Sequence, residues 1–176
     1  MNEANCIRGI TMPSILIADD NERIRRGLKE LLETQPGWQV IGEAASGLEA
    51  VEKAAQLAPE VVILDISMPQ LDGIGAAPLI RKAVPEVELL VLSQHDTPDI
   101  VKKALEAGVR GYVLKSTAPR DLVAAVEAVH RHQSFLSVEV SAAVRVAMPS
   151  PSAPGIETGP GGEAGSAVPS KNGIEN

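Results

Sequence analysis

The chain has 176 residues, a net charge of −7 and one residue each of Trp, Tyr and Phe, so Val, Ile, Leu and Ala must build its core. The single cysteine, Cys6, excludes an internal disulfide and a cysteine-based metal cluster. Lys and Arg are not clustered, no apolar run reaches the roughly 18 residues of a membrane span, and residues 1–13 have no apolar signal segment, so we expect a cytoplasmic protein that binds neither membranes nor nucleic acid.

Five short apolar runs alternate with helical patterns between residues 14 and 133. The expected strands are Ser14–Ala18, Trp38–Gly42, Val61–Leu64, Val87–Leu92 and Gly111–Leu114. These runs are apolar throughout, which is typical of strands buried on both faces in a parallel sheet. The sequence therefore predicts an α/β fold in which five helices flank a five-stranded, doubly wound parallel sheet.

The helical patterns carry their own start signals. Ser46 and Glu49 form the capping-box pattern S-x-x-E ahead of the second helix. Thr97 followed by Pro98 predicts the start of the fourth, because proline is tolerated at the first helical position. In the third helix, Pro78 must fall in the first turn or kink the helix, since it has no backbone N–H to donate.

The composition changes after residue 133. Residues 1–13 are expected to be a flexible N-terminus and residues 14–133 one domain. Val138, Ala142 and Val146 recur at fourfold spacing, which indicates an extra helix or linker over residues 134–148. More than half of residues 148–176 are Gly, Pro or Ser, a composition that cannot bury enough apolar surface to offset ordering entropy, so residues 149–176 are expected to be a disordered tail.

Polar side chains follow four of the five expected strands. Asp19 and Asp20 end the first strand, Asp65 the third, Ser93 the fourth and Lys115 the fifth. Ligands of open parallel sheets bind beyond the carboxyl ends of the strands, at one edge. Three carboxylates, a hydroxyl and an ammonium group are therefore expected to meet there.

This combination of side chains predicts phosphoryl chemistry. Each residue alone has a simpler explanation, since Asp19, Asp20 or Ser93 could cap a helix or turn and Lys115 could be solvated. Together, the crowded carboxylates repel one another unless a hard cation such as Mg²⁺ lies between them. Lys115 and Ser93 could then hold an anion beside the metal, and the central carboxylate, Asp65, is best placed to be a nucleophile.

Residues 14–133 resemble the receiver domain of two-component response regulators, and most closely the LuxR-type branch. The resemblance rests on ILIADD, VVILDISMPQLDG, LVLS and EAGVRGYVLKS, in the family's order and spacing. It implies a flavodoxin-like sheet with strand order 2-1-3-4-5. It also implies that Asp65 accepts a phosphoryl group from the phosphohistidine of a sensor histidine kinase, in a phosphorelay.

The resemblance also implies roles for the surrounding residues. Ser93 and Lys115 would hold the phosphoryl oxygens, and Tyr112 would be a switch aromatic that turns inward when Ser93 is drawn to the phosphate. The phosphorylation and dephosphorylation would be self-catalysed, without turnover of another substrate. The implied Mg²⁺ ligands are Asp20, Asp65, the backbone carbonyl of Ser67 and, through a water molecule, Asp19.

The resemblance does not extend to an output domain. LuxR-type regulators carry a C-terminal helix-turn-helix domain, whereas residues 149–176 show no helical periodicity and few cations. We therefore expect either a single-domain receiver or one whose output domain was lost or truncated, with no DNA binding by this chain. A downstream protein or a second copy of the chain would then read the signal.

Two other functions remain open from the sequence. A pseudo-receiver would serve only as an interaction module, although the complete acidic set disfavours it. A phosphatase of the haloacid dehalogenase type also uses a strand-end aspartate, Mg²⁺ and lysine. That class needs a second acid two residues after the nucleophile, where this chain has Ser67.

Overall fold

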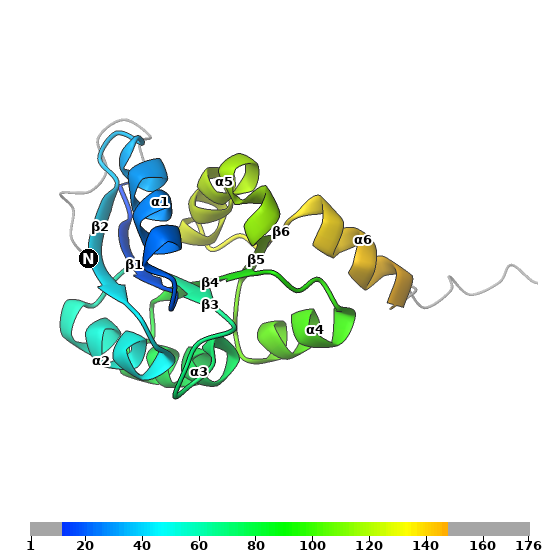
Figure 1. Cartoon of the computed structure of the whole chain (residues 1–176), viewed down its shortest axis with the longest axis horizontal. Coiled ribbons are helices and arrows are strands. Elements are labelled where there is room, and N and C mark those ends of the chain that lie inside the picture. The colour runs from blue at the N-terminus through cyan, green and yellow to red at the C-terminus, as the bar shows by residue number, and fades with distance from the viewer. Residues whose placement is uncertain (1–11, 148–176) are drawn as a thin grey trace, which may run out of the picture.

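The computed structural model describes residues 12–147 as one parallel sheet with helices on both sides (Figure 1). The predictions for residues 1–11 and 148–176 lie outside the described residues. No helix within residues 12–147 is long and apolar enough to cross a membrane. The elements are β1 (Ser14–Ala18), α1 (Glu22–Glu33), β2 (Gln39–Ala44), α2 (Gly47–Leu57), β3 (Val61–Asp65), α3 (Gly73–Ala83), β4 (Glu88–Ser93), α4 (Pro98–Glu106), β5 (Gly111–Leu114), a 3-10 turn (Lys115–Thr117), α5 (Ala118–His130), β6 (Phe135–Leu136) and α6 (Val138–Ala147).

The strand order is β2-β1-β3-β4-β5-β6, so the predicted five-stranded order is confirmed and extended by one strand. The sequence analysis did not expect β6, because two residues are too few to show a strand pattern. This strand pairs with β5 in parallel, with Phe135 opposite Gly111 and Leu136 opposite Tyr112. The second strand ends at Ala44, two residues beyond the expected end at Gly42.

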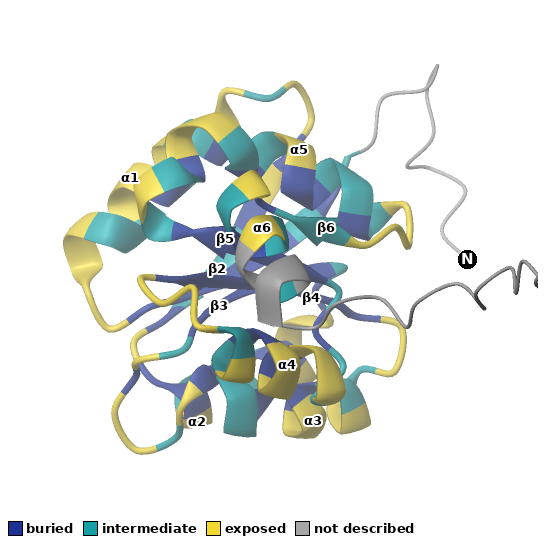
Figure 2. Cartoon of the chain, turned by 90° about the vertical axis from the view of Figure 1, so that its right-hand side faces the viewer, coloured by how far each residue is buried: buried dark blue, intermediate teal, exposed yellow. Residues whose placement is uncertain are grey.

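The sheet is buried on both faces, as its apolar strands predict. Helices α1 and α5 cover one face, and α2, α3 and α4 cover the other (Figures 1 and 2). Successive residues of β3 serve the two cores in turn: Ile63 packs with the α1 and α5 side chains, and Leu64 with those of α2, α3 and α4. Because β1 and β3 lie inside the sheet between two helical layers, their ends are held firmly in place.

Two of the three helix signals behave as expected. The Ser46 hydroxyl accepts a hydrogen bond from the Glu49 N–H at 3.2 Å, and the Glu49 carboxylate accepts one from the N–H of the residue before Ser46 at 2.7 Å. Pro98 begins α4. Pro78 lies in the second turn of α3, which begins at Gly73, so the first-turn alternative for this residue is wrong.

Candidate functional site

Three carboxylates meet where β1 and β3 end. The two strands pair in parallel with Ala18 opposite Leu64, so the residues that follow, Asp19 and Asp65, emerge side by side. One carboxylate oxygen from each of Asp19, Asp20 and Asp65 lies within 4.8 Å of the others. Asp19 and Asp65 are buried and Asp20 is exposed, so the cluster opens to solvent on one side. Such a cluster could bind a divalent metal ion, for which carboxylate oxygens are suitable ligands.

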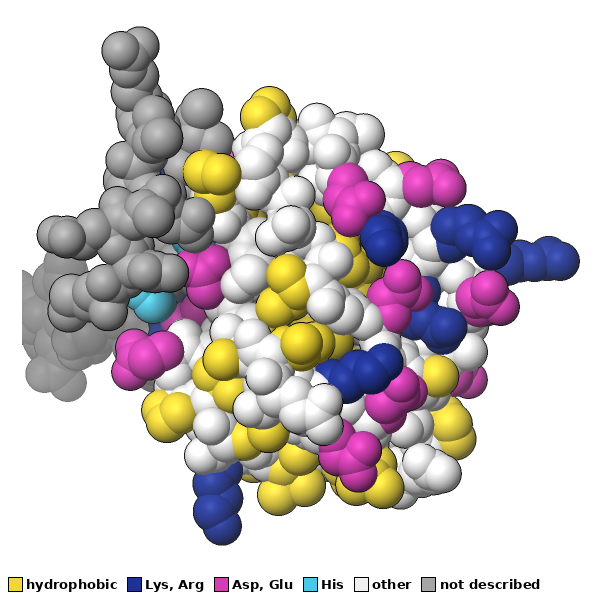
Figure 3. Space-filling view, turned by 90° about the vertical axis from the view of Figure 1, so that its left-hand side faces the viewer, with side chains coloured by type: hydrophobic (Ala, Val, Ile, Leu, Met, Phe, Trp, Pro, Cys, Tyr) yellow, Lys and Arg dark blue, Asp and Glu magenta, His cyan; other side chains and the backbone are white. Residues whose placement is uncertain are grey.

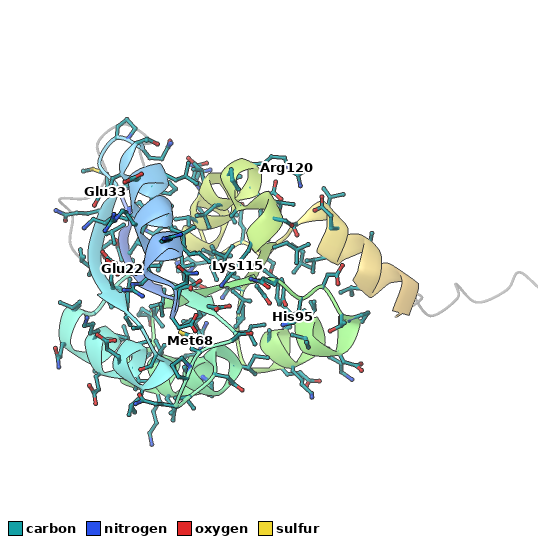
Figure 4. All side chains as sticks on the ribbon, in the orientation of Figure 1. Glu22, Glu33, Met68, His95, Lys115 and Arg120 are labelled. Atoms are coloured by element: carbon teal, nitrogen blue, oxygen red, sulfur yellow. The ribbon has the colours of Figure 1, made fainter. Side chains whose placement is uncertain are left out.

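Lys115 points into this cluster from the end of β5 (Figure 4). Its Nζ lies 2.7 Å from Asp19 Oδ2 and 2.9 Å from Asp65 Oδ2. Burial alone would lower the pKa of Lys115, but the hydrogen bonds to the two carboxylates outweigh it and raise that pKa. The lysine therefore stays charged and offsets one of three negative charges, which leaves the site attractive to a further cation.

The backbone at the end of β1 is held by two residues that the sequence analysis missed. Asn21 donates its N–H to Asp19 Oδ1 at 2.9 Å, and its own side chain caps α1. Arg25 donates from Nη1 to the Asp19 carbonyl oxygen at 2.7 Å, and its Nε pairs with Glu43 at 3.3 Å. Asn21 carries a readable signal, since asparagine is a preferred N-cap. The bond from Arg25 depends on tertiary geometry alone.

A cavity of about 190 Å³ opens beside the cluster. It brings together four of the predicted site residues and adds the side chain of Gln94 from the β4–α4 connection. Its lining residues are Asp20, Asn21, Ile24, Asp65, Ser67, Gln94 and Lys115. The volume suits a small anion and a metal ion rather than a large substrate.

A larger hollow of about 370 Å³ lies elsewhere, and no strand-end acid lines it. It runs along the exposed side of α1 towards β2, where charges of both signs are interspersed (Figure 3). Its lining residues are Glu22, Arg26, Lys29, Glu30, Glu33 and Glu43. The chemistry at the strand ends, rather than cavity size, therefore identifies the functional site.

The loop after Asp65 folds back tightly onto that residue. A Cβ atom at Gly73 would lie 2.2 Å from the Asp65 carbonyl oxygen, and the Gly73 N–H donates to the Ile66 carbonyl at 3.1 Å. Gly73 is therefore required by close backbone approach. The left-handed residue of this loop is Gln70, with φ of 67°. Together these contacts position Ser67 beside the cavity.

Ser93 and Tyr112 are linked through one residue of the β4–α4 connection, His95. The buried Ser93 Oγ accepts a hydrogen bond from the His95 N–H at 3.0 Å, and the Tyr112 hydroxyl donates to the His95 carbonyl at 2.6 Å. Tyr112 is fully buried, which raises the pKa of its hydroxyl. The ring thus already lies inward in this conformation.

A doubly wound sheet with carboxylates and one lysine at its strand ends defines a class of signalling domain that responds to phosphoryl groups. The family model described as "Response regulator receiver domain" matches residues 15–127. The chain belongs to this family, and it is a receiver domain of two-component systems, a signalling protein rather than a conventional enzyme.

Relatives and solved structures agree on this family. The response regulator protein VraR of Staphylococcus aureus is 37% identical over 131 residues, which cover 74% of this chain and 63% of VraR. The chain thus spans less than two thirds of that relative's length. A LuxR-family two-component response regulator from Aurantimonas is 31% identical, with a TM-score of 0.75 and coverage of 78% of this chain and 98% of that one.

One further structure bears on the site. The isolated REC domain of RcsB from Salmonella enterica, in the presence of phosphomimetic BeF3-, is 30% identical with a TM-score of 0.70. The match covers 75% of this chain and 98% of the RcsB domain. With these matches, neither the pseudo-receiver nor the phosphatase alternative is favoured.

Proposed function

We propose that Asp65 is the phosphoacceptor of this receiver domain. One observation carries the proposal: the Lys115 ammonium group bridges Asp65 and Asp19 within a cluster of three carboxylates. Asp65 is the central member, at the end of a strand that is buried throughout. A carboxylate held in place beside a cation can act as a nucleophile.

The reaction follows from this arrangement. An Asp65 oxygen attacks the phosphorus of a phosphohistidine, a P–O bond forms and the P–N bond breaks. The phosphoryl group moves to the carboxylate, and the imidazole leaves with the bond's electron pair. Asp20, Asp65 and the Ser67 carbonyl would hold Mg²⁺ directly, and Asp19 through water, and the ion would supply charge neutralisation. We assign phosphorylation and dephosphorylation to these residues of the receiver itself.

The hydroxyl and ammonium groups would hold the new phosphoryl oxygens. Lys115 would donate to one of them, and Ser93 to another. The Ser93 hydroxyl now accepts from the His95 N–H, so a Ser93 side chain that turned towards the phosphoryl group would give up this bond. His95 also accepts the Tyr112 hydrogen bond, so displacement of its backbone would reach Tyr112. Tyr112 is therefore proposed as a switch residue.

The partners follow from the same role. A sensor histidine kinase would supply the phosphoryl group, and a downstream protein or a second copy of the chain would read it. Residues 14–133 would form the receiver unit, and residues 134–148 would link it to whatever follows. Most of the buried core lies on strands and helices through α5, which supports this division, although Val140 of α6 also joins one cluster.

Acetyl phosphate with Mg²⁺ tests the acceptor directly. Intact-mass measurement should find one phosphoryl group on the wild type and on Asp99→Asn, which changes an exposed carboxylate in α4. Asp65→Asn should remain unmodified, because its amide oxygen is a poor nucleophile. Equal labelling of Asp65→Asn would move the acceptor elsewhere. A wild type that takes up no phosphoryl group would support the pseudo-receiver instead.

A further inference from the structure

Strand β6 and helix α6, which follow α5, pack against the core cluster that contains Tyr112. Strand β6 lies beside β5, and α6 crosses the edge of the sheet between α5 and α4 (Figure 2). The Val140 side chain of α6 is fully buried in the same core cluster as Tyr112 and the α4 residues Val101 and Ala104. The cluster that contains the proposed switch residue is thus closed by a helix from outside the receiver unit.

Strand β6 is held firmly at the end of the sheet opposite the acidic cluster. Glu88 is buried, and its carboxylate pairs with Arg110 Nε at 2.6 Å and with His132 Nδ1 at 2.7 Å. The Arg110 carbonyl also accepts the Phe135 N–H at 3.2 Å. These contacts fix the turn between α5 and β6, so β6 cannot leave without disturbing the partners of the buried Glu88 carboxylate.

Helix α6 is held more lightly. Val140 is its one fully buried residue among those whose side chains are described, and Val138 is 74% exposed. The ion pair between Glu139 and Arg120 spans 3.1 Å, but both side chains are solvent-exposed, and pairs of this kind contribute little. At the junction with β6, the Ser137 hydroxyl is buried without a hydrogen-bond partner in the described part of the chain, a cost that opening would relieve.

Tyr112 contacts both the site and this segment. Its hydroxyl donates to the His95 carbonyl, and its backbone carbonyl accepts the Ser137 N–H at 3.0 Å. We propose that α6 is a releasable cover whose docking on α4 opposes phosphorylation of Asp65, with Ser137 as the hinge. The inference rests on the proposed function, in which a phosphoryl group draws Ser93 away from His95 and so loosens the packing beneath Val140.

Hydrogen exchange on the wild-type chain tests the release without any substitution. Beryllofluoride with Mg²⁺ is the probe, as a stable mimic of the phosphoryl group. Amides of Val138–Ala147 should exchange about tenfold faster once the mimic is bound, whereas those of β6 should keep their protection. Unchanged protection in α6, with the mimic bound at the site, would overturn the inference.

The reciprocal effect is tested by undocking α6. If docking opposes the phosphorylated state, Val140→Asp should raise the affinity for beryllofluoride about tenfold, because coupling between two sites is symmetric. Val138→Asp places the same charge on the exposed side of the same helix and should leave this affinity unchanged. Equal or weaker affinity for Val140→Asp would contradict the proposal. If Val140→Asp fails to fold in a thermal scan, Val140→Ala makes the same comparison with a smaller expected gain.

The two proposals fail in different ways. A wild type that neither takes up phosphate nor binds beryllofluoride removes both. The second proposal alone fails if Asp65 is phosphorylated normally but hydrogen exchange in α6 is unchanged and the two valine variants bind beryllofluoride equally.

Discussion

Asp65→Asn should make the metal-free protein more stable while removing its response to Mg²⁺. At an effective dielectric constant of about 20, two carboxylates whose oxygens lie within 4.8 Å repel by at least about 3.5 kcal/mol. By the same relation, attraction between Asp65 and Lys115 at 2.9 Å contributes about 6 kcal/mol. Removing the charge of Asp65 ends two repulsions and one attraction, and the repulsions are larger in sum by about 1 kcal/mol.

Magnesium should reverse this order. An ion present at about 100 times its dissociation constant stabilises the folded state by about 2.7 kcal/mol. The wild type should gain this amount, whereas Asp65→Asn lacks one of the proposed ligands and should gain little. The variant is therefore expected to be the more stable protein with chelator and the less stable one with Mg²⁺.

Urea unfolding at low ionic strength, with chelator and with saturating Mg²⁺, measures both orders. Glu52→Gln is a matched control, since it removes one carboxylate from an exposed position of α2. It should change stability by less than about 0.5 kcal/mol in either buffer. The reasoning fails if Asp65→Asn is less stable than the wild type in chelator, or if it retains the full gain from Mg²⁺.

Two further substitutions test the surroundings of the site. Arg25→Ala removes the donor to the Asp19 carbonyl and should raise the Mg²⁺ dissociation constant about tenfold. Arg25→Lys should recover part of the affinity. A titration with unchanged affinity would show that Arg25 does not position the acids. Hydrogen bonds from the backbone and from Lys53 lower the pKa of Glu49 in the folded protein. The ionised Glu49 therefore stabilises the fold above the unfolded pKa of about 4.3, and this contribution is lost as pH falls through the folded pKa. Glu49→Gln should therefore lose less stability than the wild type between neutral pH and pH of about 3, as measured by urea midpoints, and parallel losses would contradict this.

The fold was predictable because its first five strands appear in the sequence as short, largely apolar runs of residues. Runs such as Val61–Leu64 are apolar throughout, and only a strand covered on both faces buries every residue of such a run. Strand β6 escaped prediction for the opposite reason. Phe135 and Leu136 form a strand only because β5 and the Glu88 cluster present an edge beside them, and neither is visible in the local sequence.

The acids of the site were predictable because strand ends converge wherever parallel strands lie side by side. Asp19 and Asp65 needed only the correct strand order to be placed together. The Arg25 contact and the buried state of Tyr112 depend on side chains that arrive from other elements. For Tyr112, the core cluster that buries the ring includes Val140, which lies beyond the receiver unit as the sequence delimits it.

The acids at the ends of β1 and β3 are held more rigidly than the β4–α4 connection on the other side of the site. This difference determines which surface of the domain can respond to a change at the site. Asp19 and Asp65 end central strands that are packed between two helical layers, so their positions are fixed. The β4–α4 connection is exposed around His95, and Thr97 begins α4 without a side-chain capping bond. If Asp65 is the phosphoacceptor, as proposed, the fixed acids leave this connection to accommodate the phosphoryl group. Its displacement would then reach α4, which follows it directly, and α6, which packs against α4.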